Sequence, residues 1–261
     1  MNANSHFKKI GGLASAFVFF VAFGFLTHRY LYEAPVLMYH HVDNALSGSS
    51  NFVSPESFQR QMEFLKVHRY RVVGLAELIR EVKEKKTIPA KTVAITFDDG
   101  NLDNFQNAFP ILKKMDFPAT LFMISSNVGK KDSLSEEDLR ILDGSNITIG
   151  SHTIHHAFLP ELPPEEVKKE LVNSREVLEK ILGHEVTLFS YPAGGVTPEI
   201  ERMVQEAGYV GAVTTNYGTK NDDPYALHRV KVGERSGNLF NFWFKLSGYS
   251  RWGKKHVEAV E

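Results

Sequence analysis

The chain contains no cysteine in 261 residues. This absence excludes disulfide scaffolds, thiolate metal sites and cysteine nucleophiles, and it also excludes a lipid anchor attached through cysteine. Any metal ion must therefore be held by histidine, aspartate or glutamate. The formal net charge is only −1, so the chain lacks the basic excess that attracts nucleic acid, and we expect no nucleic-acid partner.

Charge is also absent from one long segment near the amino terminus. Ile10–Leu26 carries no charged side chain and follows Lys8 and Lys9. As a helix this segment spans roughly 25 Å, close to the thickness of the hydrocarbon core of a bilayer. We therefore predict a membrane-spanning signal anchor with a cytoplasmic amino terminus. A cleaved signal peptide is the alternative, although the small residues that cleavage requires do not follow the run.

The predicted organisation is a cytoplasmic tail (1–9), a transmembrane anchor with its interface residues (10–32) and one outward-facing domain (33–261). The protein would then be a single-pass cell-membrane protein whose domain is extracellular. Cleavage of the amino-terminal segment would release that domain as a secreted protein.

The outward-facing part alternates apolar runs typical of strands with segments of helical periodicity. The predicted strands are Pro35–His41, Arg71–Val73, Thr92–Phe97, Ala119–Ile124, Ile147–Gly150, Thr187–Tyr191, Gly211–Thr214 and Arg229–Val232. The first predicted helix begins at Ser54-Pro55. The other predicted helices are Leu75–Lys86, Asn104–Met115, Ser135–Leu142, Pro164–Leu182 and Pro198–Ala207. This alternation predicts parallel strands with helices outside them. A closed or nearly closed barrel fits the count, and an open doubly wound sheet is the alternative.

Five polar clusters directly follow or begin predicted strands. They are His40-His41, Asp98-Asp99-Gly100, the histidines at 152, 155 and 156, Tyr191–Gly195 and His228-Arg229. Because barrels of this kind gather their chemistry where the strands end, we expect these clusters to share one face. Taken alone, the Asp-Asp-Gly triplet is typical of a turn, and the histidines could be surface residues. Taken together, Asp99, His152 and His156 offer two nitrogens and one oxygen to a metal, with positions left open for water and substrate.

The motifs resemble those of one known family. Thr96–Gly100 reads T-F-D-D-G, His152–His156 reads H-T-I-H-H, and Phe189–Gly195 stands where a third motif is expected. This pattern resembles the polysaccharide deacetylase family, the NodB homology group of carbohydrate esterase family 4, over about residues 35–235. The opening Pro35–Val42 resembles the subgroup that acts on poly-N-acetylglucosamine.

The resemblance implies a distorted (β/α)7-type barrel and a hydrolase that removes N-linked acetyl groups from a cell-surface polysaccharide, either poly-N-acetylglucosamine-like or peptidoglycan. It implies that Asp98 is the general base that activates a metal-bound water. It implies that Asp99, His152 and His156 hold a divalent ion, with zinc expected and cobalt or nickel as alternatives. The implied partners are an N-acetylated polysaccharide and, through the anchor, the membrane.

Two further roles follow from the resemblance. His40 is implied as the general acid, and strand alternation favours it over the neighbouring His41. The backbone N–H of Tyr191 is implied as a donor to the oxyanion, although its ring could instead form an aromatic wall for a sugar. His155 is expected to face away from the metal.

The sequence departs from the family pattern in its third motif, which lacks the usual arginine that orients the base. Arg229 is the candidate replacement, and a structural ion pair on the barrel rim is the alternative reading of this residue. Rival functions are a catalytically silent carbohydrate-binding protein on the same barrel and a different metal hydrolase. A helical zinc peptidase motif would carry Glu directly after the first histidine, where this chain has Thr153.

Overall fold

Parallel strands form a closed ring in the computed structural model, which describes residues 32–44, 51–218 and 222–247. The hydrogen-bonded order runs from β1 through β10, β9, β8, β7 and β6 to β5, and β5 pairs with β1 again. The seven strands of the ring are β1 (Val36–Tyr39), β5 (Thr92–Phe97), β6 (Ala119–Met123), β7 (Ile147–Ser151), β8 (Leu188–Ser190), β9 (Gly211–Tyr217) and β10 (Leu227–Lys231). The pairing of β1 with β5 rules out the open doubly wound sheet.

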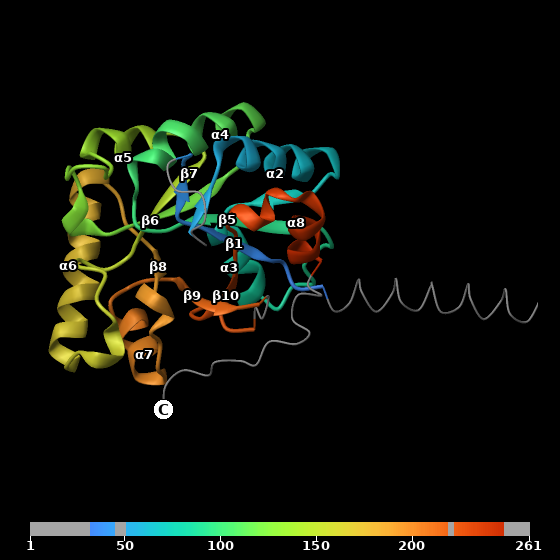
Figure 1. Cartoon of the computed structure of the whole chain (residues 1–261). Helices are drawn as coiled ribbons and strands as arrows, with labels where there is room; N and C mark the ends of the chain where they lie inside the picture. The colour runs from blue at the N-terminus through green and yellow to red at the C-terminus, as the bar shows by residue number, and fades with distance from the viewer. Residues whose placement is uncertain (1–31, 45–50, 219–221, 248–261) are drawn as a thin grey trace, which may run out of the picture.

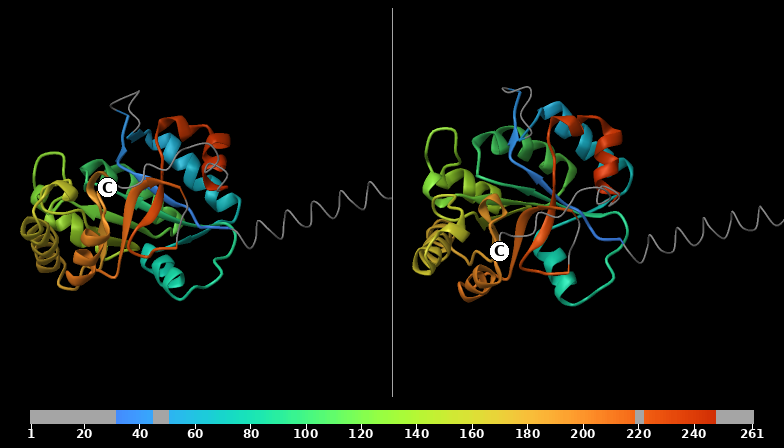
Figure 2. Two further views of the ribbon diagram at one scale, coloured as in Figure 1. Left: turned by 90° about the horizontal axis from the view of Figure 1, so that it is seen from below. Right: turned by 60° about the horizontal axis from the view of Figure 1, so that its bottom comes forward.

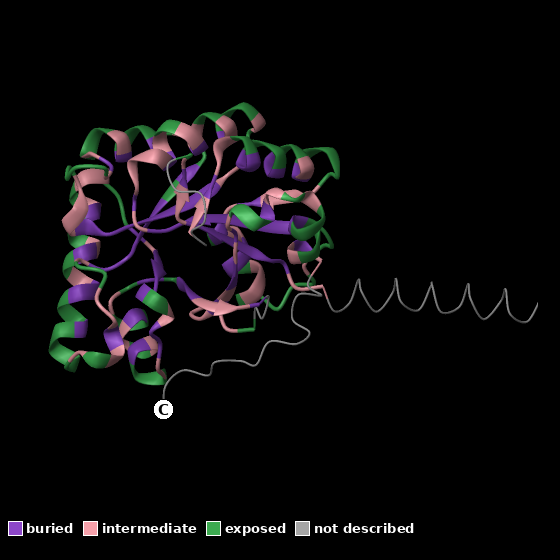
Figure 3. Ribbon diagram, in the orientation of Figure 1, coloured by how far each residue is buried: buried purple, intermediate pink, exposed green. Residues whose placement is uncertain are grey.

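Helices surround the ring, as Figures 1 and 2 show. They are α2 (Pro55–Val67), α3 (Leu75–Lys83), α4 (Phe109–Met115), α5 (Glu136–Asp143), α6 (Pro164–Leu182), α7 (Pro198–Glu206) and α8 (Leu239–Leu246). Figure 3 shows the strands buried in the middle and the outer faces of the helices exposed. All six residues of β5 are buried, as expected for a parallel strand that is covered on both faces.

Local sequence signals explain several of the element boundaries. The side chain of Ser54 caps α2 by accepting a hydrogen bond from the Ser57 N–H, and Pro55 occupies the first turn. Helix α6 runs from Pro164 to Leu182 and ends at Gly183, whose φ of 80° is most easily adopted by a residue without a Cβ. These features confirm the predicted start of the first helix and both bounds of the longest one.

Other boundaries differ from the sequence prediction. The predicted strand Pro35–His41 is interrupted at His40, because β1 ends at Tyr39 and the next two residues form β2 (His41–Val42), which pairs with β3 (Phe52–Val53). The predicted strand Arg71–Val73, in contrast, is confirmed as β4, which lies outside the ring and pairs with the first half of β5. The predicted helix Asn104–Met115 begins as a π-helical segment over Asn104–Ala108.

The predicted membrane anchor (10–32) lies outside the described residues, apart from Tyr32 at its end. Within the described part of the chain, none of the helices has the length and apolarity that a bilayer span needs.

Close packing between neighbouring strands generates a stability prediction at Gly150. A Cβ at this position would lie 2.6 Å from the Phe122 ring and 3.0 Å from the Leu188 carbonyl oxygen. We expect Gly150→Ala to lower the free energy of unfolding by about 1–3 kcal/mol through overpacking, measured by urea denaturation. Thr148→Ala, at an exposed position of the same strand, is the control and should change it by less than about 0.5 kcal/mol. Equal losses in both variants would contradict this account of the barrel.

Candidate metal centre and catalytic cavity

A cavity of about 450 Å³ opens where the strands of the barrel end. It is lined by Met38, His40, Asp98, His152, His156, Ala193, Thr215, Tyr217 and Lys231. Four of the five polar clusters predicted from the sequence contribute a residue to this lining. The fifth contributes through Arg229, which lies in β10 and contacts Asp98 beneath the cavity. The predicted convergence on one face of the barrel is therefore observed.

Asp99, His152 and His156 lie close enough together to share one ion. One potential ligand atom from each falls within 4.8 Å of the others. The Nε2 atoms of His152 and His156 are 3.7 and 3.8 Å from Asp99 Oδ1. Two imidazole nitrogens and one carboxylate oxygen suit zinc and related divalent ions.

The environment of His152 prepares one of its ring nitrogens for a metal. Its Nδ1 lies 2.7 Å from the carbonyl oxygen of Ser190. A carbonyl only accepts, so Nδ1 carries the proton and Nε2 keeps its lone pair toward Asp99. Burial lowers the pKa of His152 despite the opposing effect of Asp98, and this favours the neutral form that binds a metal.

Two of the three candidate ligands have a left-handed backbone. The φ angles of Asp99 and His156 are 75° and 58°, a region that residues with a Cβ adopt at a cost of about 1–3 kcal/mol. Surrounding contacts must hold these residues in place, and such strain is concentrated at functional sites.

Asp98 and Arg229 form a fully buried ion pair beside the candidate metal centre. The carboxylate and the guanidinium are 1% and 0% exposed. Arg229 donates to Asp98 through Nη1–Oδ1 at 2.7 Å and Nη2–Oδ2 at 2.6 Å. Its remaining N–H groups reach Thr96 Oγ1, Ser190 Oγ and the Thr214 carbonyl. All five guanidinium donors are thus satisfied.

The ion pair fixes the charge of Asp98. Burial raises the pKa of this carboxyl, but the charge and hydrogen bonds of Arg229, together with His152 and His40, lower it by more and bring the pKa to about 2. Asp98 is therefore ionised at neutral pH. Arg229, the predicted replacement for the missing third-motif arginine, contacts Asp98. Its effect on catalysis remains a prediction.

The two adjacent histidines after β1 lie in different environments. His40 lines the cavity, and burial lowers its pKa against the opposing influence of Asp98. His41 is not among the lining residues; its Nδ1 lies 2.6 Å from Asp103 Oδ2, and its ring stacks on Phe52. This geometry favours His40 as the residue that can reach a substrate.

The structure corrects the prediction for Tyr191. Its backbone N–H donates to the Val213 carbonyl at 3.1 Å, and its side chain is completely buried. Neither the N–H nor the ring is available to an oxyanion or a sugar. Ala193, two residues later, lines the cavity with a φ of 52°. The ladder between β8 and β9 continues through Tyr191, so the N–H of this residue is used within the barrel wall.

Other residues of the cavity were missed in the sequence. Thr215 and Tyr217 lie in the second half of β9, and Lys231 ends β10. The predicted strand ends at Thr214 because polar residues follow it, whereas β9 continues to Tyr217. Thr and Tyr favour strands. His155 is not among the cavity-lining residues, as predicted, and it contacts Glu170 instead.

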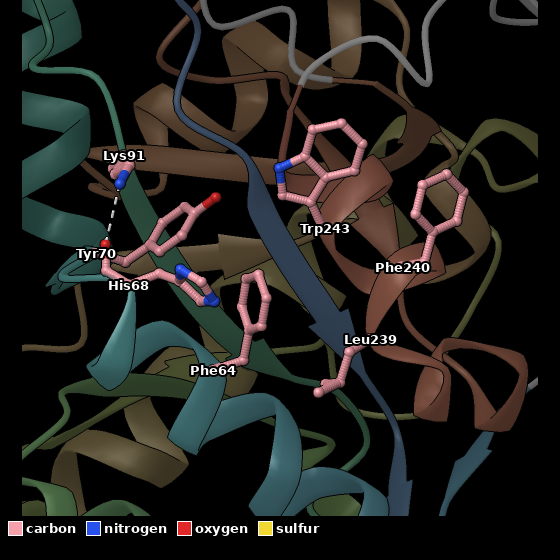
Figure 4. Close-up of a pocket in the computed structure, with 7 residues that line it drawn as sticks. All are labelled: Phe64, His68, Tyr70, Lys91, Leu239, Phe240 and Trp243. Atoms are coloured by element: carbon pink, nitrogen blue, oxygen red, sulfur yellow. Dashed lines mark hydrogen bonds between the residues drawn. The ribbon is translucent and has the colours of Figure 1, made fainter.

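A second pocket of about 330 Å³ lies away from these residues (Figure 4). Tyr70 and Lys91, which immediately precede β4 and β5, contribute to it together with the aromatic side chains of Phe240 and Trp243 on α8. It therefore lies toward the opposite end of the barrel. Its lining includes one histidine and lacks a carboxylate, so it does not offer the set of ligands that a metal centre needs.

The chain is similar to known polysaccharide deacetylases. The family model described as polysaccharide deacetylase matches residues 85–212. YxkH of Bacillus subtilis, a protein assigned to the polysaccharide deacetylases, is 36% identical over 216 residues, which cover 82% of this chain and 76% of that protein. The poly-beta-1,6-N-acetyl-D-glucosamine N-deacetylase of Staphylococcus aureus is 26% identical, with 70% of this chain and 68% of that protein covered.

A solved structure also resembles the fold. The structure of IcaB from Ammonifex degensii superposes with a TM-score of 0.73 at 28% sequence identity. The match covers 82% of this chain and 97% of that chain.

The buried ion pair generates a prediction about stability. Arg229→Met leaves the Asp98 carboxylate buried without its partner, and we expect a loss of about 3–5 kcal/mol in the free energy of unfolding at pH 7. Adding Asp98→Asn should recover part of that loss, because the double variant no longer buries a lone charge. The measurement is a double-mutant cycle by guanidinium denaturation.

The pH dependence of this coupling has a defined sign. Because folding lowers the pKa of Asp98 from 3.8 to about 2, the stabilisation is complete above pH 3.8 and declines as the pH falls toward 2. In the double-mutant cycle at pH 7, if the losses in unfolding free energy of the two single variants simply add in the double variant, Asp98 and Arg229 are not coupled.

Proposed function

This chain belongs to the polysaccharide deacetylase family, and on that premise we propose that it is a metal-dependent hydrolase that removes N-linked acetyl groups from a cell-surface polysaccharide. The observation that carries the proposal is the cluster of Asp99, His152 and His156. Its two histidines line the cavity beside the ionised Asp98. Every group that a minimal deacetylation requires lines this cavity or contacts its lining.

The proposed general base is Asp98. It would accept a proton from the water that attacks the acetyl carbonyl. Arg229 would hold both carboxylate oxygens in a fixed orientation and keep the carboxyl ionised. A carboxylate with such a low pKa is a weak base, and a divalent ion held by Asp99, His152 and His156 would compensate by acidifying the water and polarising the carbonyl.

Two further groups complete the proposed mechanism. His40 lines the same cavity and would protonate the departing sugar amine, whose release as an anion is unfavourable. The backbone N–H of Ala193, in place of Tyr191, would stabilise the oxyanion that forms on the acetyl carbonyl. Its position in the cavity lining supports this assignment.

Poly-N-acetylglucosamine is the proposed substrate, with peptidoglycan as the second candidate. The support is the similarity to the Staphylococcus aureus enzyme, whose name specifies the poly-beta-1,6-linked polymer, together with the Pro35–Val42 segment. Zinc is the proposed metal, and cobalt or nickel would suit the same ligand set.

Acetate release tests the catalytic proposal directly. The full chain, supplied with zinc, should release acetate from poly-beta-1,6-N-acetylglucosamine, and removal of the metal with a chelator should abolish this release. Asp98→Asn should lower the rate by about 10²-fold or more while zinc still binds. Asp99→Asn should abolish both binding and release.

The matched control is Asp143→Asn, which removes an aspartate that pairs with His184 on the outside of the barrel. It should leave acetate release unchanged. Wild-type protein that binds zinc without releasing acetate from either polymer would instead favour a silent carbohydrate-binding protein.

We further propose that residues 10–32 tether the domain to the outer face of the cell membrane. The hydroxyl of Tyr32 donates to the Thr92 carbonyl at the start of β5, whereas the cavity lies where the strands end. A tether that precedes Tyr32 would therefore leave the cavity facing away from the bilayer. The full chain should float with liposomes in a density gradient, and a variant lacking residues 1–31 should not. Equal flotation of both would refute the tether.

A further inference from the structure

Helix α6 contacts the histidine-bearing turn on both sides of His152. Ser174 Oγ lies 2.8 Å from the hydroxyl of Ser151, the last residue of β7. Glu170 precedes Ser174 by four residues and therefore occupies the same face of the helix. It contacts the turn beyond His152, so that one face of α6 meets the segment before and after the first candidate ligand.

Glu170 makes three contacts with this turn. Its Oε2 accepts hydrogen bonds from the backbone N–H groups of Ile154 at 2.8 Å and His155 at 3.0 Å. Its Oε1 lies 2.6 Å from His155 Nδ1. Glu170 is only 8% exposed, so its two contacts with backbone N–H groups are largely shielded from water.

The turn needs such support because its backbone is strained. Thr153 and His156 have φ angles of 65° and 58°, and Thr153 is β-branched, which makes this conformation especially unfavourable. The two N–H groups that Glu170 binds belong to the two residues between these strained positions. A carboxylate is well suited to accept from both, because hydrogen bonds to an ionised acceptor are stronger than neutral ones.

We propose that Glu170 is a positioning residue that holds His156 in the geometry required for metal binding. It acts through the backbone of the turn and does not touch the ion. Its effect is to keep His156 Nε2 within reach of Asp99 and His152. The inference rests on the proposed function only in assigning these three residues to a metal.

The ring of His155 contributes less than the two backbone N–H groups. Its side chain is 67% exposed, so water screens its interaction with Glu170. Removing the ring leaves the carboxylate bound to both N–H groups. Replacing the carboxylate with a neutral group weakens the hydrogen bonds to both N–H groups.

Zinc affinity, measured by calorimetry on the full chain, tests the proposal. In Glu170→Gln the amide oxygen can still reach both N–H groups of the turn, but it accepts from them as a neutral group, whose hydrogen bonds are weaker than those of a carboxylate. Its NH₂ group takes the place of Oε1 beside His155 Nδ1. We expect the zinc dissociation constant to rise about 10- to 100-fold, the range seen when groups supporting a metal ligand are lost. His155→Ala should change it by less than about threefold.

Two controls separate positioning from general stability. Glu166→Gln alters an exposed glutamate of α6 that pairs with Lys169, and it should leave zinc affinity unchanged. The absorption spectrum of bound Co²⁺ should change in Glu170→Gln, because the ligand geometry shifts, and remain the same in Glu166→Gln. Should Glu170→Gln fail to fold, Glu170→Asp, which keeps the charge on a shorter side chain, should weaken zinc binding in the same direction.

The outcomes are distinct. Glu170→Gln with lower thermal stability but wild-type zinc affinity and Co²⁺ spectrum overturns the proposal, as does His155→Ala with an equal loss of affinity. Wild-type protein that binds zinc but releases no acetate refutes the proposed activity and leaves the role of Glu170 intact. Wild-type protein that does not bind zinc overturns both.

Discussion

The buried pair between Asp98 and Arg229 links the barrel to its chemistry. A lone charge would be very costly at this depth, yet both groups are almost completely buried. The pair is tolerated because the closed ring of strands surrounds it with acceptors. Arg229 comes from β10, and its other partners come from β5, β8 and β9. The interaction that orients the proposed base therefore also connects four strands.

The division of roles between Asp98 and Asp99 follows from their position at the end of one strand. Adjacent residues of an extended chain point in opposite directions. Asp98 turns inward to Arg229, and Asp99 adopts a left-handed backbone that brings its carboxylate to His152 and His156. Two neighbouring carboxylates are thereby kept apart, one neutralised by a guanidinium and the other free to bind a cation.

Much of this arrangement is visible in the sequence, because it depends on local signals. The run Thr92–Phe97 is uncharged, is rich in residues that favour strands and ends at the aspartates, so its bounds and the site that follows it were both predicted. Features that depend on tertiary contacts were not predicted. The ladder with β9 buries Tyr191. The pairing of β2 with β3 interrupts the first strand at His40. The docking of α6 brings Glu170 to the histidine-bearing turn. None of these contacts has a signature in nearby residues.

The most direct test of the central claim is a crystal structure of the zinc-bound protein, with the ion located by its anomalous scattering. We predict one ion within about 2.0–2.2 Å of Asp99 and of the Nε2 atoms of His152 and His156, with Asp98 still paired to Arg229. An ion bound by Asp98, or located away from these three residues, would contradict the account.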